Sequence, residues 1–102
     1  MRYQLVLQFT ADMIADFDQL VALEEKLIEA LEHSAIVDGH DFGKSEFNIF
    51  ILTNEPAMAF DKSHRVIRDQ RLQQGMRAAY REPPGESFMI LWPTTLTEFS
   101  VI

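Results

Sequence analysis

Hydrophobic and polar residues alternate near the start of the chain, in the stretch YQLVLQF at residues 3–9. Successive side chains of a strand point to opposite faces, so this alternation predicts a strand with one apolar face. The apolar positions are Tyr3, Leu5, Leu7 and Phe9, and the positions between them are Gln4, Val6 and Gln8. Such a strand is typical of an antiparallel sheet that is covered on one side.

The next stretch has the spacing of an amphipathic helix. From about Asp16 to His33, hydrophobic residues recur every three or four positions and glutamates lie mostly between them. Asp16 is the predicted N-cap, and Gln19 three residues later completes a pair that resembles a capping box. His33 falls at the C-terminal end, where a histidine interacts favourably with the helix dipole.

A second helix is predicted from about Glu55 to Gln74. Thr53 or Asn54 is expected to cap it, and Pro56 lies in the first turn, where its missing N–H costs no hydrogen bond. Gly75 follows as a residue that adopts the left-handed conformation with which helices commonly end.

The remaining apolar runs predict four strands. AIVDGHDF at residues 35–42 and EFNIFILT at residues 46–53 are separated only by GKS, so these two strands must be antiparallel. Two further apolar-rich runs flank Pro83–Pro84–Gly85 and predict a terminal hairpin. Residues 94–102 have no clear period, and we expect either an added edge segment or a loose tail.

The element order is strand, helix, strand, strand, helix, strand, strand. Placing both helices on one face of an antiparallel sheet is the simplest way to bury both apolar stripes. The sequence therefore predicts an α+β fold, a ferredoxin-like sandwich of order βαββαββ. The 102 residues form one domain, with a core at residues 1–93 and a C-terminal tail at residues 94–102.

Three segments of this sequence resemble a group of small bacterial proteins. The segments are VDGHDFGKSEFNIFILTNEP, AAYRE and FMILWP, and together they span Val37 to Pro93. The group shares a D-G-H/N-D-x-G turn before an N-I-F-I strand, then an A-Y-R strand and an L-W-P strand. This chain has Lys44–Ser45 where the group usually has small residues. It has Asn54–Glu55 before Pro56 where the group more commonly has two acids. Because the group has no established function, the resemblance implies a ferredoxin-like fold but does not indicate an activity.

Composition narrows the classes of partner. The chain has 16 acidic and nine basic residues and a formal net charge of −7, which disfavours nucleic acid and anionic membranes. It has no cysteine, hence no disulfide and no thiolate metal site. No apolar run approaches the ~20 residues that span a bilayer, and Met1–Arg2 leads directly into a strand rather than a signal peptide. We expect a soluble, cytoplasmic protein.

A group of acids around a histidine is the most chemically suggestive motif. Asp38, His40 and Glu46 offer nitrogen and oxygen ligands of the kinds that metals use. Asp38 and His40 would share one side of a strand, with Asp41 on the other unless a glycine makes a bulge. The simpler interpretation is a turn whose side chains bind nearby backbone N–H groups, and a ligand-binding rim is the third. We predict no metal and no cofactor.

For His64 and for the arginines near the C-terminal hairpin, the sequence allows both a structural and a functional interpretation. His64 lies on the apolar face of the second helix, where it either packs against the sheet edge or lines a cleft. Tyr80 and Glu82 share one face of a strand, and Arg81 lies on the other. Arg81 or Arg77 either pairs with a neighbouring strand or binds an acidic group of a ligand, since the guanidinium engages carboxylates with two parallel hydrogen bonds.

Two strands are apolar on both faces. Phe50 and Leu52 lie opposite Phe47, Ile49 and Ile51, and Phe88, Ile90 and Trp92 lie opposite Met89 and Leu91. Helices cover only one face of the sheet, so something must cover the second, because large exposed apolar patches mark interfaces or ligand grooves. One possibility is that two sheets pair in a homodimer. The other is that the tail folds over the face; its apolar residues are Leu96, Phe99, Val101 and Ile102.

Three functions are consistent with these features. The first is a non-enzymatic binding module that dimerises, or that binds a protein or a small molecule through the second face. The second is a small enzyme that uses His40, Asp38, His64 or Tyr80 as acid or base, and the third is an acidic inhibitor of a cationic enzyme. The candidate ligand- or partner-binding residues are Asp38, His40, Asp41, Glu46, Asn48, Phe50, Leu52, Arg77, Tyr80, Arg81 and Trp92.

Overall fold

The computed structural model describes residues 1–14, 17–43 and 45–101. Its elements are β1 (Tyr3–Thr10), the 3-10 helix η1 (Ala11–Met13), α1 (Phe17–Ala30), β2 (Ala35–Phe42), β3 (Glu46–Thr53), α2 (Pro56–Asp69), β4 (Arg77–Arg81) and β5 (Met89–Trp92). The predicted α+β class is confirmed, as are the bounds of β2 and β3. The helix η1 was not predicted. No helix in the described ranges is long and apolar enough to cross a membrane.

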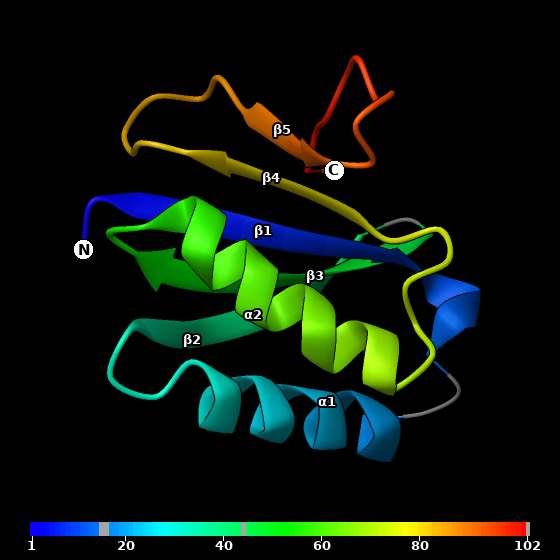
Figure 1. The fold of residues 1–102 in the computed structure, drawn as a ribbon. Coiled ribbons are helices and arrows are strands. Elements are labelled where there is room, and N and C mark those ends of the chain that lie inside the picture. The colour runs from blue at the N-terminus through cyan, green and yellow to red at the C-terminus, as the bar shows by residue number, and fades with distance from the viewer. Residues whose placement is uncertain (15–16, 44, 102) are drawn as a thin grey trace.

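The five strands form one sheet in the order β2-β3-β1-β4-β5, and each neighbouring pair is antiparallel. Strand β1 is therefore central, between β3 and β4, and both predicted hairpins are present. Figure 1 shows that α1 and α2 lie on the same side of the sheet, with α2 across the central strands and α1 near the edge strand β2. Within the described ranges, neither α1 nor α2 reaches the opposite side of the sheet.

The side of the sheet that packs against the helices is called the helix face, and the other side the second face. On β1 the predicted alternation holds: Leu5, Leu7 and Phe9 belong to the core cluster beneath the helices. Val6 points to the second face and is nevertheless fully buried. Both faces of the central strand are therefore shielded from water.

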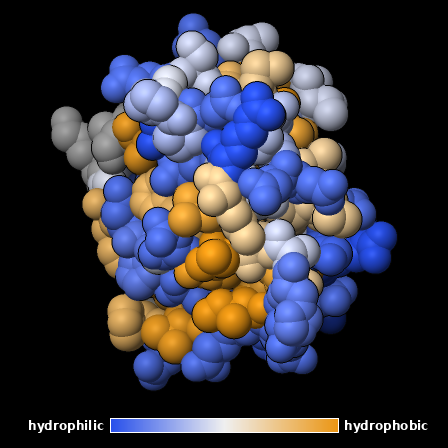
Figure 2. All heavy atoms as spheres, turned by 90° about the vertical axis from the view of Figure 1, so that its left-hand side faces the viewer, coloured by the Kyte–Doolittle hydropathy of each residue, from blue (hydrophilic) through white to orange (hydrophobic). Residues whose placement is uncertain are grey.

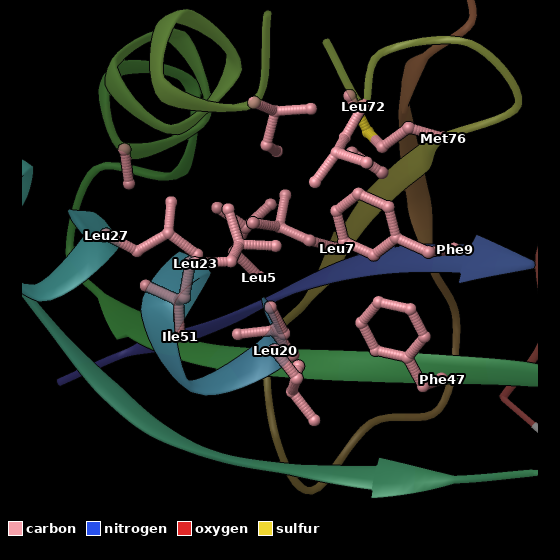
Figure 3. Close-up of a cluster of buried hydrophobic side chains, with 14 of the residues drawn as sticks. Leu5, Leu7, Phe9, Leu20, Leu23, Leu27, Phe47, Ile51, Leu72 and Met76 are labelled. Atoms are coloured by element: carbon pink, nitrogen blue, oxygen red, sulfur yellow. The ribbon is translucent and has the colours of Figure 1, made fainter. Parts of the chain in front are cut away.

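The core lies between the helix face and the two helices. The rings of Phe9 on β1 and Phe47 on β3 stack with their centroids 4.9 Å apart and their planes 9° from parallel. Figure 3 shows these two rings beside leucines of α1 that point towards the sheet. The buried residues of α1 are Leu20, Leu23 and Leu27. Their three- and four-residue spacing places them on one stripe of the helix. Phe17 and Ile28, which the hydrophobic spacing also assigned to the apolar stripe, are exposed instead.

Helix α1 is shorter at its C-terminal end than predicted. It ends at Ala30, and the predicted cap Asp16 lies outside the described residues. His33 was predicted to be the last helical residue, but it follows the helix in the left-handed conformation, with φ at 68°. The left-handed conformation of His33 breaks the helical path, and the N–H groups of Ser34 and Ala35 both donate to the carbonyl of Leu31, at 2.9 and 3.0 Å.

Helix α2 begins and ends differently from the prediction. Its N-cap is Glu55, without a side-chain cap, and the hydroxyl of Thr53 accepts the backbone N–H of Glu55 instead. The helix ends at Asp69, before the predicted Gln74 and Gly75. The N–H groups of the two residues after the cap donate to the carbonyls of Arg68 and Ile67, which is a Schellman arrangement.

The left-handed position of that C-terminal turn is held by Arg71, whose φ is 61°. Glycine is the residue that most often occupies such a position, because it has no Cβ to clash with the backbone. An arginine at this position does not indicate the end of a helix. The sequence pattern therefore predicts that the helix continues to Gln74, just before Gly75.

Hydrophobic side chains also reach the surface. Figure 2 views the side of the molecule where α1 ends and β2 begins, and hydrophobic atoms gather at its middle and lower part among hydrophilic ones. The large hydrophobic residues that are exposed among the described residues are Met1, Phe17, Ile28, Ile36, Phe42, Met58 and Met89. Four of these seven belong to α1 and β2, so exposure is concentrated on one part of the fold.

Replacing Phe47 by alanine tests the importance of the ring stack. Phe47 is fully buried, and Phe→Ala in a core costs about 3–5 kcal/mol, because transfer free energy is lost and a cavity remains. We expect that decrease in the free energy of unfolding from urea denaturation. Phe42→Ala serves as the matched control, because Phe42 is 62% exposed and should change stability by less than about 1 kcal/mol. Equal losses in both variants would contradict the assigned core.

Candidate functional site

The second face consists of three rows of side chains that run across the strands. In antiparallel strands, directly opposite residues point to the same face, so the register defines each row. The middle row is apolar and consists of Phe50, Val6, Ala79 and Ile90, with Gly39 at the β2 end. One flanking row is Ile36, Leu52, Gln4 and Arg81, and the other is Asp41, Asn48, Gln8 and Arg77.

The row that contains Gln8 forms a continuous hydrogen-bond chain. Gln8 Nε2 donates to Asn48 Oδ1 at 3.0 Å, and Asn48 Nδ2 donates to Asp41 Oδ1 at 3.0 Å. Gln8 Nε2 also donates to the backbone oxygen of Ser100 at 2.9 Å. Gln8 and Asn48 are buried, and within the described residues no buried side-chain nitrogen or oxygen lacks a partner. Buried polar groups are tolerated only when satisfied in this way.

The bond to Ser100 places the C-terminal segment, residues 94–101, on the second face. Phe99 of this segment packs against Phe88, with ring centroids 5.0 Å apart. The segment therefore covers part of the second face within one chain, which is one of the two possibilities that the sequence left open. Ile102, which was expected to contribute, lies outside the described residues. Homodimerisation through this face stays a prediction.

A pocket of about 480 Å³ remains between the C-terminal segment and the sheet. It is lined by Gln4, Phe50, Arg81, Glu86, Phe88, Phe99, Ser100 and Val101. A neighbouring hollow of about 600 Å³ extends it towards Arg77 and Ile90 on the far side of Phe88 and Phe99. Half of these lining residues are apolar, and the polar ones include one basic and one acidic side chain. Ligand pockets likewise combine apolar contact with a few placed polar groups.

Arg81 is the best-oriented polar group of the pocket. Its Nε donates to Gln4 Oε1 at 2.9 Å, and its Nη1 donates to the backbone oxygen of Gly85 at 3.0 Å. These bonds use two of the five N–H donors of a guanidinium and fix its direction. Arg81 therefore bonds across to β1 through the neutral amide of Gln4 rather than through the cross-strand charge pair that the sequence predicted, and three donors are left for a ligand.

The acids and the histidine of β2 do not form one cluster. His40 lies opposite Ile49 on the helix face, whereas Asp41 lies opposite Asn48 on the second face. His40 Nδ1 is 2.8 Å from Glu24 Oε1 of α1, a partner that the sequence did not suggest. No group of three or more possible metal ligands is found among the described residues.

Two details of the β2–β3 hairpin correct the expected geometry of that cluster. The register shifts between Val37 and Gly39, so Asp38 is the additional residue of a bulge, and strict alternation no longer places it beside His40. Glu46 lies two residues before Asn48 on β3 and so shares the second face with it, away from His40. The three proposed ligands therefore do not converge.

Trp92 belongs to a different part of the molecule from the one predicted. A register shift in the β4–β5 pair places Trp92 opposite Ala78 on the helix face, whereas Ile90 lies opposite Ala79 on the second face. There the indole packs against His64 of α2, with ring centroids 4.7 Å apart, and His64 stacks on Phe60 at 5.1 Å. His64 therefore packs against the sheet edge, which was one of its two predicted roles.

Tyr80 also points away from the pocket. It lies opposite Leu5 on the helix side, and its ring meets Tyr3 edge-on at 5.6 Å. Tyr80 lines a separate hollow of about 350 Å³ near Arg2 and Met89. Of the predicted residues, the structure thus brings Phe50 and Arg81 into the main pocket, and places Asn48 and Asp41 in the adjoining polar row.

Several residues of the site were not singled out from the sequence. Gln4 and Gln8 were assigned to the second face, but only the register reveals their bonds to Arg81 and Asn48. Phe88 lies outside β5, and Glu86 lies in the hairpin connection. The alternation in the sequence grouped Phe88 with Ile90, but the place of Phe88 and Glu86 in a pocket depends on where the C-terminal segment lies.

Comparison of the chain with protein-family models, with curated protein sequences and with solved structures found no match.

The environment of His64 generates a pH prediction. Burial lowers the pKa of His64 below its ordinary value of 6.5, Arg68 lowers it further, and Asp61 opposes the shift. The unfolded chain therefore takes up a proton more readily than the folded one as the pH falls below about 6.5. Neutral His64 therefore contributes its full stabilisation above about pH 6.5, the pKa in the unfolded chain. This contribution is lost as the pH falls from there through the lower pKa that His64 has in the folded protein.

We expect His64→Phe to flatten the fall in Tm between about pH 7.5 and pH 5, because phenylalanine can keep the ring packing but does not titrate. His33→Gln is the matched control, because the His33 side chain is 89% exposed. Thermal denaturation followed by circular dichroism measures both. A fall in Tm as steep in His64→Phe as in the wild type would contradict the assignment.

Proposed function

We propose that the protein is a binding module whose ligand site is the pocket between the second face and the C-terminal segment. The observation that supports this most directly is the oriented guanidinium of Arg81 at the border of a pocket of about 480 Å³ with four apolar lining residues. A cavity of this size with few, well-placed polar groups is the usual form of a small-molecule site.

The lining favours a small molecule with an apolar body and an anionic end. Phe50, Phe88, Phe99 and Val101 offer apolar contact, and Arg81 offers several N–H donors. A guanidinium recognises carboxylates through paired hydrogen bonds, and these are stronger than bonds between neutral groups. Glu86 also lines the pocket and would repel a second anionic group, so a single carboxylate at one end of the ligand fits best.

An enzymatic role is the weaker alternative. A catalytic site would need two of the candidate acid–base residues at one pocket, since a general acid or base acts within hydrogen-bond reach of the reacting atom. His40 pairs with Glu24 beside α1, His64 packs on Trp92, and Tyr80 packs on Tyr3. These three groups belong to separate places in the fold, and none lines the pocket of about 480 Å³. Tyr80 shares only the hollow of about 350 Å³ with Arg81, without a second acid–base candidate among the three.

We also propose that the fold is a ferredoxin-like sandwich extended by one strand. The order β1, α1, β2, β3, α2, β4 supports this, with η1 inserted after β1 and β5 added at the sheet edge. The added strand matters for function, because the connection to β5 supplies Glu86 and Phe88 and the segment after β5 supplies Phe99 and Val101 to the pocket.

Octanoate and 1-octanol provide matched probes for this site, because they share an alkyl chain and differ in the charged end. We expect octanoate to bind and to shift the amide resonances of residues that line the pocket. Arg81→Gln should weaken octanoate binding by about tenfold or more, since a hydrogen bond to a charged group contributes about 1.5–3 kcal/mol. Binding of 1-octanol should change little.

Arg77→Gln is the control for this experiment, because Arg77 carries the same charge but lines the neighbouring hollow. NMR titration gives the dissociation constants and the location of binding together. Unmoved pocket resonances on addition of octanoate, or equal weakening by the two arginine substitutions, would refute the proposed ligand site.

Replacing Phe50 by glutamate distinguishes a ligand pocket from a subunit interface. We expect a folded variant with the same molecular mass in solution as the wild type and without octanoate binding, because a carboxylate would enter the apolar lining. Sedimentation velocity measures the mass, and circular dichroism measures the fold. A wild-type dimer that becomes a monomer in the variant would favour pairing of two sheets. An unfolded variant would place Phe50 in the core and contradict both interpretations.

A further inference from the structure

The charge of the chain is unevenly distributed. Residues 1–54 hold ten acidic and three basic residues, whereas residues 55–102 hold six of each. The whole formal charge of −7 therefore belongs to the first half of the chain, which contributes β1, α1, β2 and β3. Of these elements, β1 and β3 lie inside the sheet, so most of the exposed acids lie on α1 and on the edge strand β2.

Two exposed aromatic rings lie on this part of the surface. Phe17 at the start of α1 and Phe42 at the end of β2 are 63% and 62% exposed. Both flank the ring of His40, with centroid distances of 6.3 Å to Phe17 and 5.8 Å to Phe42. His40 is in turn held by Glu24 of α1 at 2.8 Å. The two rings are thus presented by a fixed framework that joins the helix to the strand.

Phe42 contacts the core ring of Phe47 at a centroid distance of 6.0 Å, yet among the described residues both Phe17 and Phe42 stay more than half exposed. Single exposed hydrophobic residues are ordinary, but neighbouring large apolar side chains rimmed by polar ones mark interaction surfaces. Phe17, Phe42 and the Glu24–His40 pair are here called the α1–β2 surface. The exposed acids of α1 and the turn after it are Asp18, Glu25, Glu29 and Glu32, and β2 adds Asp38.

We infer that the α1–β2 surface docks a cationic protein segment that carries apolar side chains. The two phenylalanine rings would supply the anchoring contacts, since aromatic side chains dominate interface energetics. The surrounding carboxylates would select a basic partner and accelerate its encounter with the protein. A second copy of this chain fits poorly, because it would bring the same excess of negative charge to the interface.

This surface is distinct from the pocket of the second face. His40 and Phe42 lie opposite Ile49 and Phe47, whose side chains are in the core beneath the helices, whereas the pocket lies on the reverse side of the sheet. The docking of a basic segment therefore does not depend on the proposed small-molecule site, and each can fail without the other.

Short helical peptides with a lysine face and a leucine face test the inference. We expect such a peptide to bind the full chain and to shift amide resonances of α1 and β2 in an NMR titration. Two matched peptides separate the contributions: one replaces each lysine by glutamate, and the other replaces each leucine by alanine. Both should bind at least about tenfold more weakly, because charge and apolar contact are each required.

The double variant Phe17→Ser, Phe42→Ser should weaken binding of the lysine–leucine peptide by about tenfold or more. Met89→Ser is the matched control, because Met89 is 59% exposed on β5 at the other edge of the sheet, and its loss should leave binding unchanged. Circular dichroism and the thermal unfolding midpoint verify that the variants keep their fold. Binding that is unaffected by the double variant, or that shifts resonances away from α1 and β2, would overturn the inference.

Discussion

The central strand β1 imposes the main constraint on this structure, because both of its faces must be kept from water. Leu5, Leu7 and Phe9 are buried against the helices, and Val6 is equally buried on the reverse side. Both helices lie on the same face of the sheet, so the other face needs a different cover. The second face is shielded in part by the C-terminal segment, which is attached through the hydrogen bond from Gln8 to Ser100. The pocket that contains Arg81 exists because this cover is incomplete.

Much of the fold follows from local pattern. The alternation at residues 3–9 correctly assigned each side chain of β1 to its face, and the apolar runs of β2 and β3 gave their bounds because a hairpin fixes both strands at once. The helix ends were less predictable. His33 and Arg71 adopt left-handed conformations that glycine usually takes, so tertiary contacts with the following segments, rather than residue type, determine where α1 and α2 stop.

The candidate site was only partly predictable, because it depends on register and on distant contacts. The bulge at Asp38 separates that residue from His40, and the register shift in β5 moves Trp92 to the helix face; neither shift has a signature in the sequence. Phe50 and Arg81 were identified because their strand positions place them on the second face. Phe88 and Phe99 were not assigned to a pocket, because the tail has no periodicity from which its path could be derived.

Two surfaces of different chemistry result from this arrangement. The half of the chain with balanced charge builds most of the pocket, where Arg81 and Glu86 lie among apolar side chains. The acidic half presents the α1–β2 surface, where Phe17 and Phe42 flank His40. The two proposed ligands, a small apolar anion and a basic protein segment, would therefore bind on opposite sides of one sheet and would not compete.

The position of the C-terminal segment is tested most directly by nuclear Overhauser effects in a dilute, monomeric sample. Cross-peaks between the ring protons of Phe88 and Phe99, and between the Gln8 side-chain amide and the backbone near Ser100, are expected, because the rings lie 5.0 Å apart and the amide bonds the Ser100 carbonyl. If these cross-peaks are absent and residues 94–101 have the shifts of an unfolded chain, the second face is not covered by its own tail, and the pocket does not exist in the monomer.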